Sequence, residues 1–187
     1  MVAAILEAAT RVLAQRGWEG FGTNEVAAVA GVSVGSLYQY FPNKLALAEA
    51  IRQRHLDDVL AALARAGEGD ARASLADRAV RLVAGVVAAH AVDPSLHRIL
   101  LTEVPLVDRS HYDAFERAYQ RLYRDVVATG PGAPDDLRDE AAARVLAAAV
   151  EGVVHAAARQ GALASPLLKD ELERLVRGYL RERGRGG

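Results

Sequence analysis

Hydroxyl, phenol, amide and ammonium groups are concentrated in one short stretch of the chain, residues 23–44, with the sequence TNEVAAVAGVSVGSLYQYFPNK. Groups of this kind contact phosphate oxygens and the edges of bases in nucleic acids. Within the same stretch, residues 31–35 read GVSVG and fit the G-x-S-x-G pattern of a serine nucleophile. The residue types therefore suit either hydrogen bonding to DNA or acyl transfer.

Two short helical patterns position these groups. The first begins at Thr23, whose hydroxyl can accept a backbone N–H as an N-cap. Val26, Val29 and Ala30 follow at the spacing of one buried helical face. A glycine at position 31 can adopt the positive φ that ends a helix in a sharp turn. The pattern predicts a short helix that stops at Gly31.

A second short helix is predicted directly after this turn. Ser33 can cap it and Pro42 ends it. Leu37, Tyr40 and Phe41 are expected to face inward. The other side chains of this helix are expected to point outward: Val34, Gly35, Ser36, Tyr38 and Gln39. Two helices joined by so tight a turn form a helix-turn-helix, whose second helix can lie in a major groove of DNA.

An acyl-transfer role for Ser33 makes further demands on the sequence. It needs a strand before the serine, and an acid and a histidine after it in an α/β sheet. An alanine-rich helical pattern precedes Ser33, and no segment shows the alternation of a strand. A serine hydrolase is therefore the least favoured alternative, and we expect the protein not to be an enzyme.

The segment GVSVGSLYQYFPNK resembles the signature of the TetR family of transcriptional regulators. In that family the recognition helix ends in a Tyr-x-Tyr-Phe run, followed by a lysine that opens the next helix. The resemblance extends upstream through ILEAATRVLAQRGWEGFGTNEVA and covers residues 5–51. It implies an all-α protein of about nine helices. A three-helix DNA-binding domain over residues 1–45 would precede a helical effector-binding and dimerisation domain over residues 46–187.

The resemblance and the expected exposure together assign the DNA contacts. The expected DNA-binding residues are Thr23, Ser33, Val34, Gly35, Ser36, Tyr38, Gln39, Tyr40 and Lys44. Their hydroxyl, phenol and ammonium groups would hold phosphates. Gln39 could pair with adenine, and Val34 could touch a thymine methyl. Thr23 and Ser33 have the alternative role of helix caps, and Leu37 and Phe41 are expected in the core.

Glycines and prolines divide the remaining chain into further predicted helices. Their ranges are about 44–66, 71–92, 93–104, 108–127, 136–163 and 166–183. Apolar residues wrap most of the circumference of the helix over 136–163, which indicates that more than one of its faces is buried.

The last two predicted helices resemble the pair that forms the four-helix dimer interface of TetR-like regulators. Small residues recur every four positions on the first helix, and an apolar stripe follows the second. The expected interface residues are Ala148, Gly152, Ala156, Leu168, Leu172, Leu175 and Tyr179. An isologous homodimer is the default expectation. The alternative is that these stripes close the core of a monomer.

A small-molecule effector is implied by the family resemblance. The candidate pocket residues are Leu100, Glu103, Tyr112, Phe115, Tyr119, Tyr123 and His155. Most are apolar or aromatic, which suits an apolar or amphipathic ligand. Glu103 or His155 could meet a polar group of that ligand. The alternative is that these aromatic residues fill the core or lie on the surface.

Composition excludes several other classes of protein. The chain has no cysteine, which excludes disulfides and thiolate metal sites, and its five histidines lack a metal-binding spacing, so we expect no metal and no cofactor. The longest apolar run, residues 82–92, is too short for a membrane span. We therefore expect a cytoplasmic protein. Residues 1–60 contain five basic and six acidic residues, so they carry no basic patch.

These observations favour a DNA-binding transcriptional regulator. We expect a repressor that binds a pseudo-palindromic operator as a homodimer and is released by a small-molecule effector. The alternatives are a regulator that needs no ligand, or an activator of the same fold.

Overall fold

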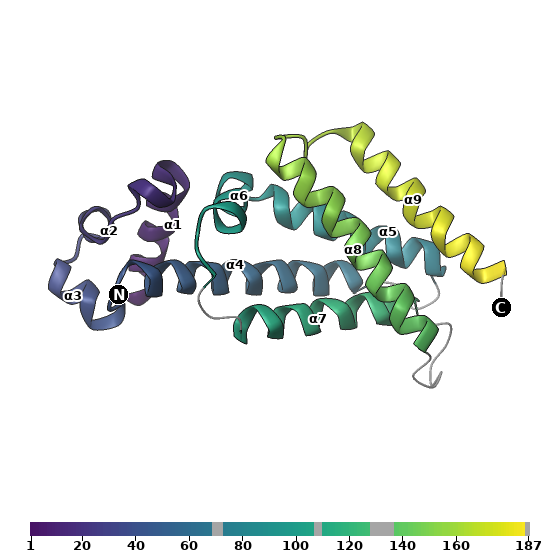
Figure 1. Ribbon diagram of the computed structural model, residues 1–187, viewed down its shortest axis with the longest axis horizontal. Helices are drawn as coiled ribbons and strands as arrows, with labels where there is room; N and C mark the ends of the chain where they lie inside the picture. Colours follow the sequence, from purple (N-terminus) through teal and green to yellow (C-terminus); the bar gives the residue numbers. More distant parts are fainter. Residues whose placement is uncertain (69–72, 107–109, 128–136, 186–187) are drawn as a thin grey trace. The chain divides into compact units, whose positions relative to one another are not determined.

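The computed structural model describes residues 1–68, 73–106, 110–127 and 137–185. The described residues form nine α-helices and no β-strand, which confirms the expected all-α class (Figure 1). The helices are α1 (Val2–Gly20), α2 (Thr23–Ala30), α3 (Val34–Tyr40), α4 (Lys44–Gly67), α5 (Leu75–Ala91), α6 (Pro94–Thr102), α7 (Ser110–Val127), α8 (Leu137–Arg159) and α9 (Pro166–Arg185).

The helices group into two compact units. The first unit consists of residues 1–57 and 93–112, and the second of residues 58–92 and 113–187. Helix α4 runs from one unit into the other, and α6 belongs to the first unit although the sequence places it after α5. The expected boundary at residue 45 falls inside the first unit and stays a prediction.

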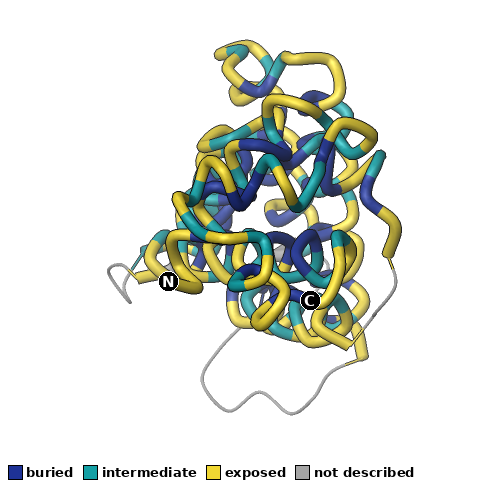
Figure 2. The backbone as a smooth tube through the Cα atoms, turned by 90° about the vertical axis from the view of Figure 1, so that its left-hand side faces the viewer, coloured by how far each residue is buried: buried dark blue, intermediate teal, exposed yellow. Residues whose placement is uncertain are grey.

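The core of the first unit comes from α1, α2, α3, the start of α4 and α6. Ile5, Leu13, Val26, Leu37 and Ile99 are among its fully enclosed side chains. Each helix contributes a buried side and leaves another side exposed, as the alternating dark blue and yellow segments of Figure 2 show. This burial is what the three-and-four spacing of apolar residues predicts for amphipathic helices.

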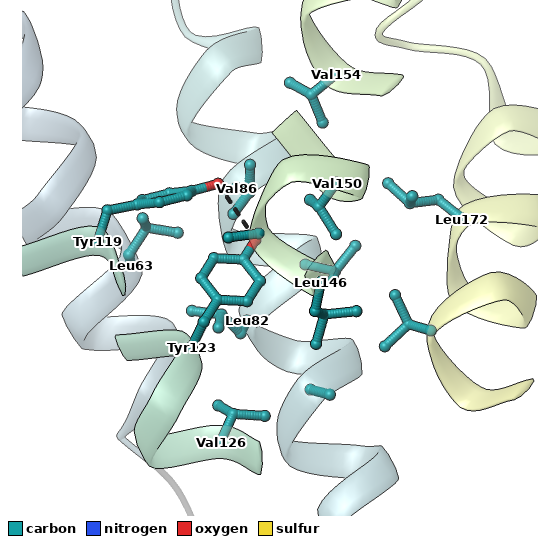
Figure 3. Packing of buried hydrophobic residues seen from close by; sticks show 14 of the residues in the cluster. Leu63, Leu82, Val86, Tyr119, Tyr123, Val126, Leu146, Val150, Val154 and Leu172 are labelled. Atoms are coloured by element: carbon teal, nitrogen blue, oxygen red, sulfur yellow. Dashed lines mark hydrogen bonds between the residues drawn. The ribbon is translucent and has the colours of Figure 1, made fainter. Parts of the chain in front are cut away.

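The core of the second unit is built around α5, α7, α8 and α9. Tyr123, Leu82, Leu146 and Val150 lie at its centre, with Leu172 of α9 on the far side of α8 (Figure 3). Helix α5 contacts both α8 and α9. Helix α8 buries residues around most of its circumference, as expected from its sequence.

One described helix, α8, is long and apolar enough to cross a membrane by its length and composition. The buried residues of this helix pack into the core of the second unit, where they contact side chains of other helices. Its apolar character is therefore what a helix buried on several sides requires.

Candidate nucleic-acid interface

The turn between α2 and α3 is held by backbone hydrogen bonds. Gly31 has φ 68° and ψ 31°, the left-handed conformation expected for it. Its N–H donates to the carbonyls of Ala27 and Ala28, and the N–H of Val32 donates to Ala27 at 3.0 Å. Two of the carbonyls in the last turn of α2 are thus satisfied, which helps to fix the direction in which the chain enters α3.

Ser33 caps α3 as predicted. Its Oγ accepts the backbone N–H of Ser36 at 3.0 Å and lies 2.8 Å from the Ser36 Oγ. Leu37 and Phe41 are buried, and they anchor α3 in the core of the first unit. The serine at the centre of the G-x-S-x-G pattern therefore sits at the start of a helix, with its hydroxyl engaged in capping. This geometry does not provide the strand-to-helix turn that a serine nucleophile needs.

Three expectations about individual positions are corrected. The N-cap of α2 is Gly22, so Thr23 is the first helical residue and makes no capping bond. Val29 and Tyr40, both expected to face inward, are each 46% exposed. The buried side of α2 is centred on Val26 and Ala27, which turns Val29 toward solvent.

Tyr40 is exposed for the same reason, because α3 buries the side that carries Leu37. Val34 was expected to point outward, but it is half-buried and packs against the core of the first unit. The exposed face of α3 therefore consists of Gly35, Tyr38, Gln39 and Tyr40.

The phenol of Tyr38 is tied to α2. Its oxygen lies 3.0 Å from Oγ1 of Thr23, a hydrogen bond in which either group can donate. Both residues belong to the expected DNA-binding set, and the structure places them together on the outside of the first unit. The hydroxyl of Thr23 thus steadies the Tyr38 side chain rather than capping a helix.

Lys44 is engaged by Trp18, a contact that the sequence analysis missed. Its Nζ donates to the Trp18 carbonyl at 2.6 Å and lies 4.1 Å from the centre of the indole ring. A cation over the face of an indole ring is stabilised by the negative potential of that face. The expected phosphate contact of Lys44 therefore has to compete with a bond inside the protein.

Two other cations of the first unit also have acidic partners. Arg16 pairs with Glu25 at 3.1 Å, and Arg52 pairs with Glu49 at 2.6 Å. The absence of a basic patch in the sequence is thus accompanied by local pairing in the structure. The polar groups that α3 presents are therefore neutral donors. They are hydroxyls, phenols, the Gln39 amide and backbone N–H groups.

Arg52 of α4 is hydrogen-bonded to the chain at the end of α6. It is only 6% exposed, and its guanidinium donates to the carbonyls of Val104 at 2.9 Å, Pro105 at 3.3 Å and Leu100 at 3.5 Å. Leu100 is in the last turn of α6, where carbonyls lack an intrahelical partner, and Val104 and Pro105 follow the helix. The sequence contains one signal of this role, because Arg52 continues the buried stripe formed by Leu47, Ala48 and Ile51.

Glu103 joins α6 to α1. One carboxylate oxygen accepts the N–H of Trp18 at 3.0 Å, and the other accepts from Arg98 at 2.7 Å. The Trp18 N–H, followed by Arg98, lowers the pKa of Glu103. At Gly17, which has φ 67°, a Cβ would lie 3.0 Å from the same carboxylate, so glycine allows both the backbone turn and the close approach.

The candidate effector residues are divided between the two units. Leu100 is buried in the core of the first unit, and Glu103 is held by Trp18 and Arg98; their place in an effector pocket stays a prediction. Tyr112 also belongs to the residues of the first unit. Phe115, Tyr119, Tyr123 and His155 lie in the second unit. Sequence order alone could not separate the two groups, because α6 folds back onto α1.

An aromatic cluster occupies the second unit. The rings of Phe115 and Tyr119 are stacked with centroids 5.5 Å apart, and the hydroxyls of Tyr119 and Tyr123 lie 3.2 Å apart (Figure 3). Burial raises the pKa of both phenols, so both remain neutral donors. The cluster is apolar with a few enclosed polar groups, as small-molecule sites are.

His155 and Glu151 add polar groups to the second unit. His155 Nε2 lies 3.8 Å from a Glu151 oxygen, and its ring stands 5.6 Å from that of His90. Burial, with the charges of His90 and Arg159, lowers the pKa of His155 to about 4. Burial and the nearby Glu116 carboxylate raise the pKa of Glu151. His155 is therefore neutral at pH 7 and can donate or accept a hydrogen bond.

The expected dimer residues differ in exposure. Ala148, Gly152 and Leu175 are exposed, whereas Ala156, Leu168 and Tyr179 are half-buried. Leu172 is 2% exposed in the single chain and packs in the core of the second unit, and its assignment to an interface stays a prediction. Val145 on α8 is also exposed and adds an apolar side chain to the exposed members of this set.

Two family profiles match the chain. One, described as bacterial regulatory proteins of the tetR family, matches residues 5–51, and the other, described as a tetracyclin repressor-like C-terminal domain, matches residues 74–180. The second match alone covers more than half of the 187 residues. The first match includes the helix-turn-helix, and the second covers most of the helical remainder of the chain.

Individual proteins are similar over part or all of the chain. The HTH-type transcriptional activator FasR of Mycolicibacterium smegmatis is 42% identical over 62 residues, which are 33% of this chain and 28% of that protein. An uncharacterized HTH-type transcriptional regulator of Mycobacterium tuberculosis is 32% identical over 102 residues, 54% of this chain and 45% of that protein. The matched segments thus span less than half the length of these relatives.

Among solved structures, a bacterial regulatory protein in the tetR family from Rhodococcus RHA1 superimposes with a TM-score of 0.70 at 25% identity. The superposition covers 96% of this chain and 94% of that one. Similarity of fold therefore extends through both units.

Proposed function

Because the chain belongs to the TetR family of bacterial regulatory proteins, we propose that it is a transcriptional regulator that binds operator DNA through α3. The observation that carries the proposal is the arrangement of α3. Its buried side is fixed by Leu37 and Phe41, its start is capped by Ser33, and its other side exposes Tyr38, Gln39 and Tyr40. A short, firmly anchored helix with such a face suits a major groove.

Individual contacts follow from the chemistry of the exposed groups. The Gln39 amide can form two hydrogen bonds with the edge of an adenine, and the half-buried Val34 can touch a thymine methyl near the start of the helix. The phenols of Tyr38 and Tyr40, the hydroxyls of Thr23 and Ser36 and the N–H groups at the start of α3 would hold phosphates. Lys44 is bonded to the Trp18 carbonyl, so we expect Lys44 to contribute less than the other groups to phosphate binding.

The regulator acts as a homodimer in this proposal. Val145, Ala148, Gly152 and Leu175 are exposed apolar or small residues on α8 and α9, and a Cβ at Gly152 would meet no atom within 4 Å. Such a surface lets a helix of a second copy approach closely. Two copies would present their α3 helices to half-sites about 34–36 Å apart.

Replacing Gln39 by alanine tests the assignment of base contacts. We expect a loss of about 1–3 kcal/mol in binding to the preferred operator, and little loss against an operator altered at one base pair in each half-site. Replacing Tyr38 by phenylalanine should instead weaken binding to all sequences equally, because a phosphate contact carries no sequence information. Fluorescence anisotropy with the operator and its single-base variants measures both effects. A uniform loss for Gln39→Ala would assign the base contact elsewhere.

An apolar or amphipathic small molecule controls the regulator in this proposal. Phe115, Tyr119, Tyr123 and His155 supply the aromatic and hydrogen-bonding groups for it. Helix α4 begins four residues after the end of α3 and carries Val59 and Leu63 in the core of the second unit. A ligand that prefers one position of α4 would therefore shift α3 and lower the affinity for DNA.

Linkage gives this mechanism a quantitative test. An effector that lowers DNA affinity by some factor must itself bind the DNA complex more weakly by the same factor. Calorimetry of the effector with the free chain and with the operator complex measures that factor directly. Equal affinity in the two titrations would contradict the mechanism.

Repression is the proposed outcome of binding, and activation is the second candidate. Activation is favoured by the resemblance of the N-terminal segment to FasR, a relative named as an activator. Transcription in vitro from a promoter that carries the selected operator distinguishes the two. The protein would act in the cytoplasm, where its DNA lies, and without enzymatic activity.

A further inference from the structure

A groove of about 340 Å³ lies on the second unit between α7 and α8. Helix α7 presents Arg117, Gln120, Arg121 and Arg124 to it, and α8 presents Arg144. The rest of its lining consists of Glu116, Glu140 and Ala143. Four arginines and two glutamates leave this surface with a positive balance.

Neither glutamate pairs with Arg117 or Arg121. Glu140 pairs with Arg144 on its own helix, and Glu116 accepts from Nε2 of Gln120 at 2.9 Å. Arg117 and Arg121 are exposed and form no ion pair within the described part of the chain. Two like charges four residues apart on a helix destabilise it slightly, so an anion bound between them would be favourable.

Two arginines on α9, in the same unit, have acidic partners. Arg174 pairs with Glu171 at 3.1 Å, and Arg177 pairs with Asp77 at 3.0 Å. The bonds from Ser74 and Arg177 lower the pKa of Asp77, so that carboxylate stays ionised. Arg117 and Arg121 therefore differ from Arg174 and Arg177, because they have no acidic partner among the described residues.

Gln120 supplies a second polar feature. Its Oε1 is enclosed and has no hydrogen-bond partner, while its amide lines the groove between the arginines. An enclosed acceptor without a partner costs free energy unless a ligand or a water donates to it.

From this arrangement we infer that the groove binds the diphosphate group of a small organic molecule. Guanidinium groups bind phosphate oxygens in pairs of parallel hydrogen bonds, and Arg117 and Arg121 stand one helical turn apart on one face of α7. Two adjacent guanidinium groups match two linked phosphates, and the side chains of Gln120 and Ala143 complete the lining where the organic part would lie. The volume of the groove falls within the range of small-molecule sites. This inference does not rest on the proposed function.

Isothermal titration calorimetry with sodium pyrophosphate, at constant ionic strength and without DNA, tests the site on the full chain. We expect saturable binding that the double substitution R117Q/R121Q weakens at least about tenfold. The control R174Q/R181Q removes the same charge from α9 and should change the affinity by less than about twofold. Circular dichroism verifies that both variants keep their helical content.

Two outcomes would overturn the inference. The first is the absence of saturable heat with pyrophosphate in the unmodified chain. The second is an equal loss in both double variants, which would show that only the overall charge matters. Because no DNA is present, neither outcome depends on whether α3 binds an operator.

Discussion

Replacing Arg52 by methionine is expected to lower the free energy of unfolding by about 3 kcal/mol. The substitution keeps much of the buried side-chain volume and removes the guanidinium. The carbonyls of Leu100, Val104 and Pro105 would then lose their donor, and Glu49 would lose its partner. Each of these losses leaves a polar group in or near the core unsatisfied, which costs more than the net gain of an exposed ion pair.

Urea denaturation followed by circular dichroism measures this effect. Arg54 is the matched control, because it lies two residues away on the exposed side of α4. Replacing Arg54 by methionine should change stability by less than about 0.5 kcal/mol. Comparable midpoints for the two variants would show that the bonds from Arg52 to the end of α6 do not hold the first unit together.

Replacing Gly85 by alanine is expected to destabilise the second unit by about 1–2 kcal/mol, although alanine is the better helix former. A Cβ at this position would lie 2.5 Å from the Cβ of Ala66 and 3.6 Å from Cδ2 of Leu63. Neither Cβ can turn away by changing a side-chain torsion, so α4 and α5 would have to separate. The clash therefore outweighs a gain in helix propensity of about 1 kcal/mol.

Two further variants make the second prediction specific. Gly178 on α9 has no atom within 4 Å of a Cβ, so Gly178→Ala should stabilise by about 0.5–1 kcal/mol. Combining Gly85→Ala with Ala66→Gly should restore most of the lost stability, because one of the two clashing methyl groups is gone. Thermal unfolding ranks all three variants. A stabilising Gly85→Ala would show that the helices do not approach as closely as the structure places them.

The sequence predicted the local features of the helix-turn-helix because they depend on neighbouring residues. The turn at Gly31 follows from the ease with which glycine adopts positive φ, and the cap at Ser33 follows from its hydroxyl. The inward orientation of Val29 and Tyr40 was wrong, because a three-residue spacing fits either edge of a helical face. The side that is buried depends on the packing of neighbouring helices.

The sequence could not predict the contacts made by distant segments. Lys44 meets Trp18, Arg52 meets the end of α6, and Glu103 meets the backbone of Trp18, 85 residues away. The bond of Glu103 depends on the packing of α6 on α1, and the other two depend on where α4 lies against α1 and the end of α6. Glu103 thus holds α1, a role that its sequence context does not indicate, and its expected ligand contact stays a prediction.

Selection of bound duplexes from a random DNA pool by the full chain tests the central claim most directly. The account predicts enrichment of an inverted repeat whose half-site centres lie about one helical turn apart, because two copies of α3 must reach the same face of the DNA. It also predicts that Gln39→Ala changes one position in each half-site of the enriched sequence. A pool that converges on no sequence, or on a single half-site without symmetry, would contradict the account.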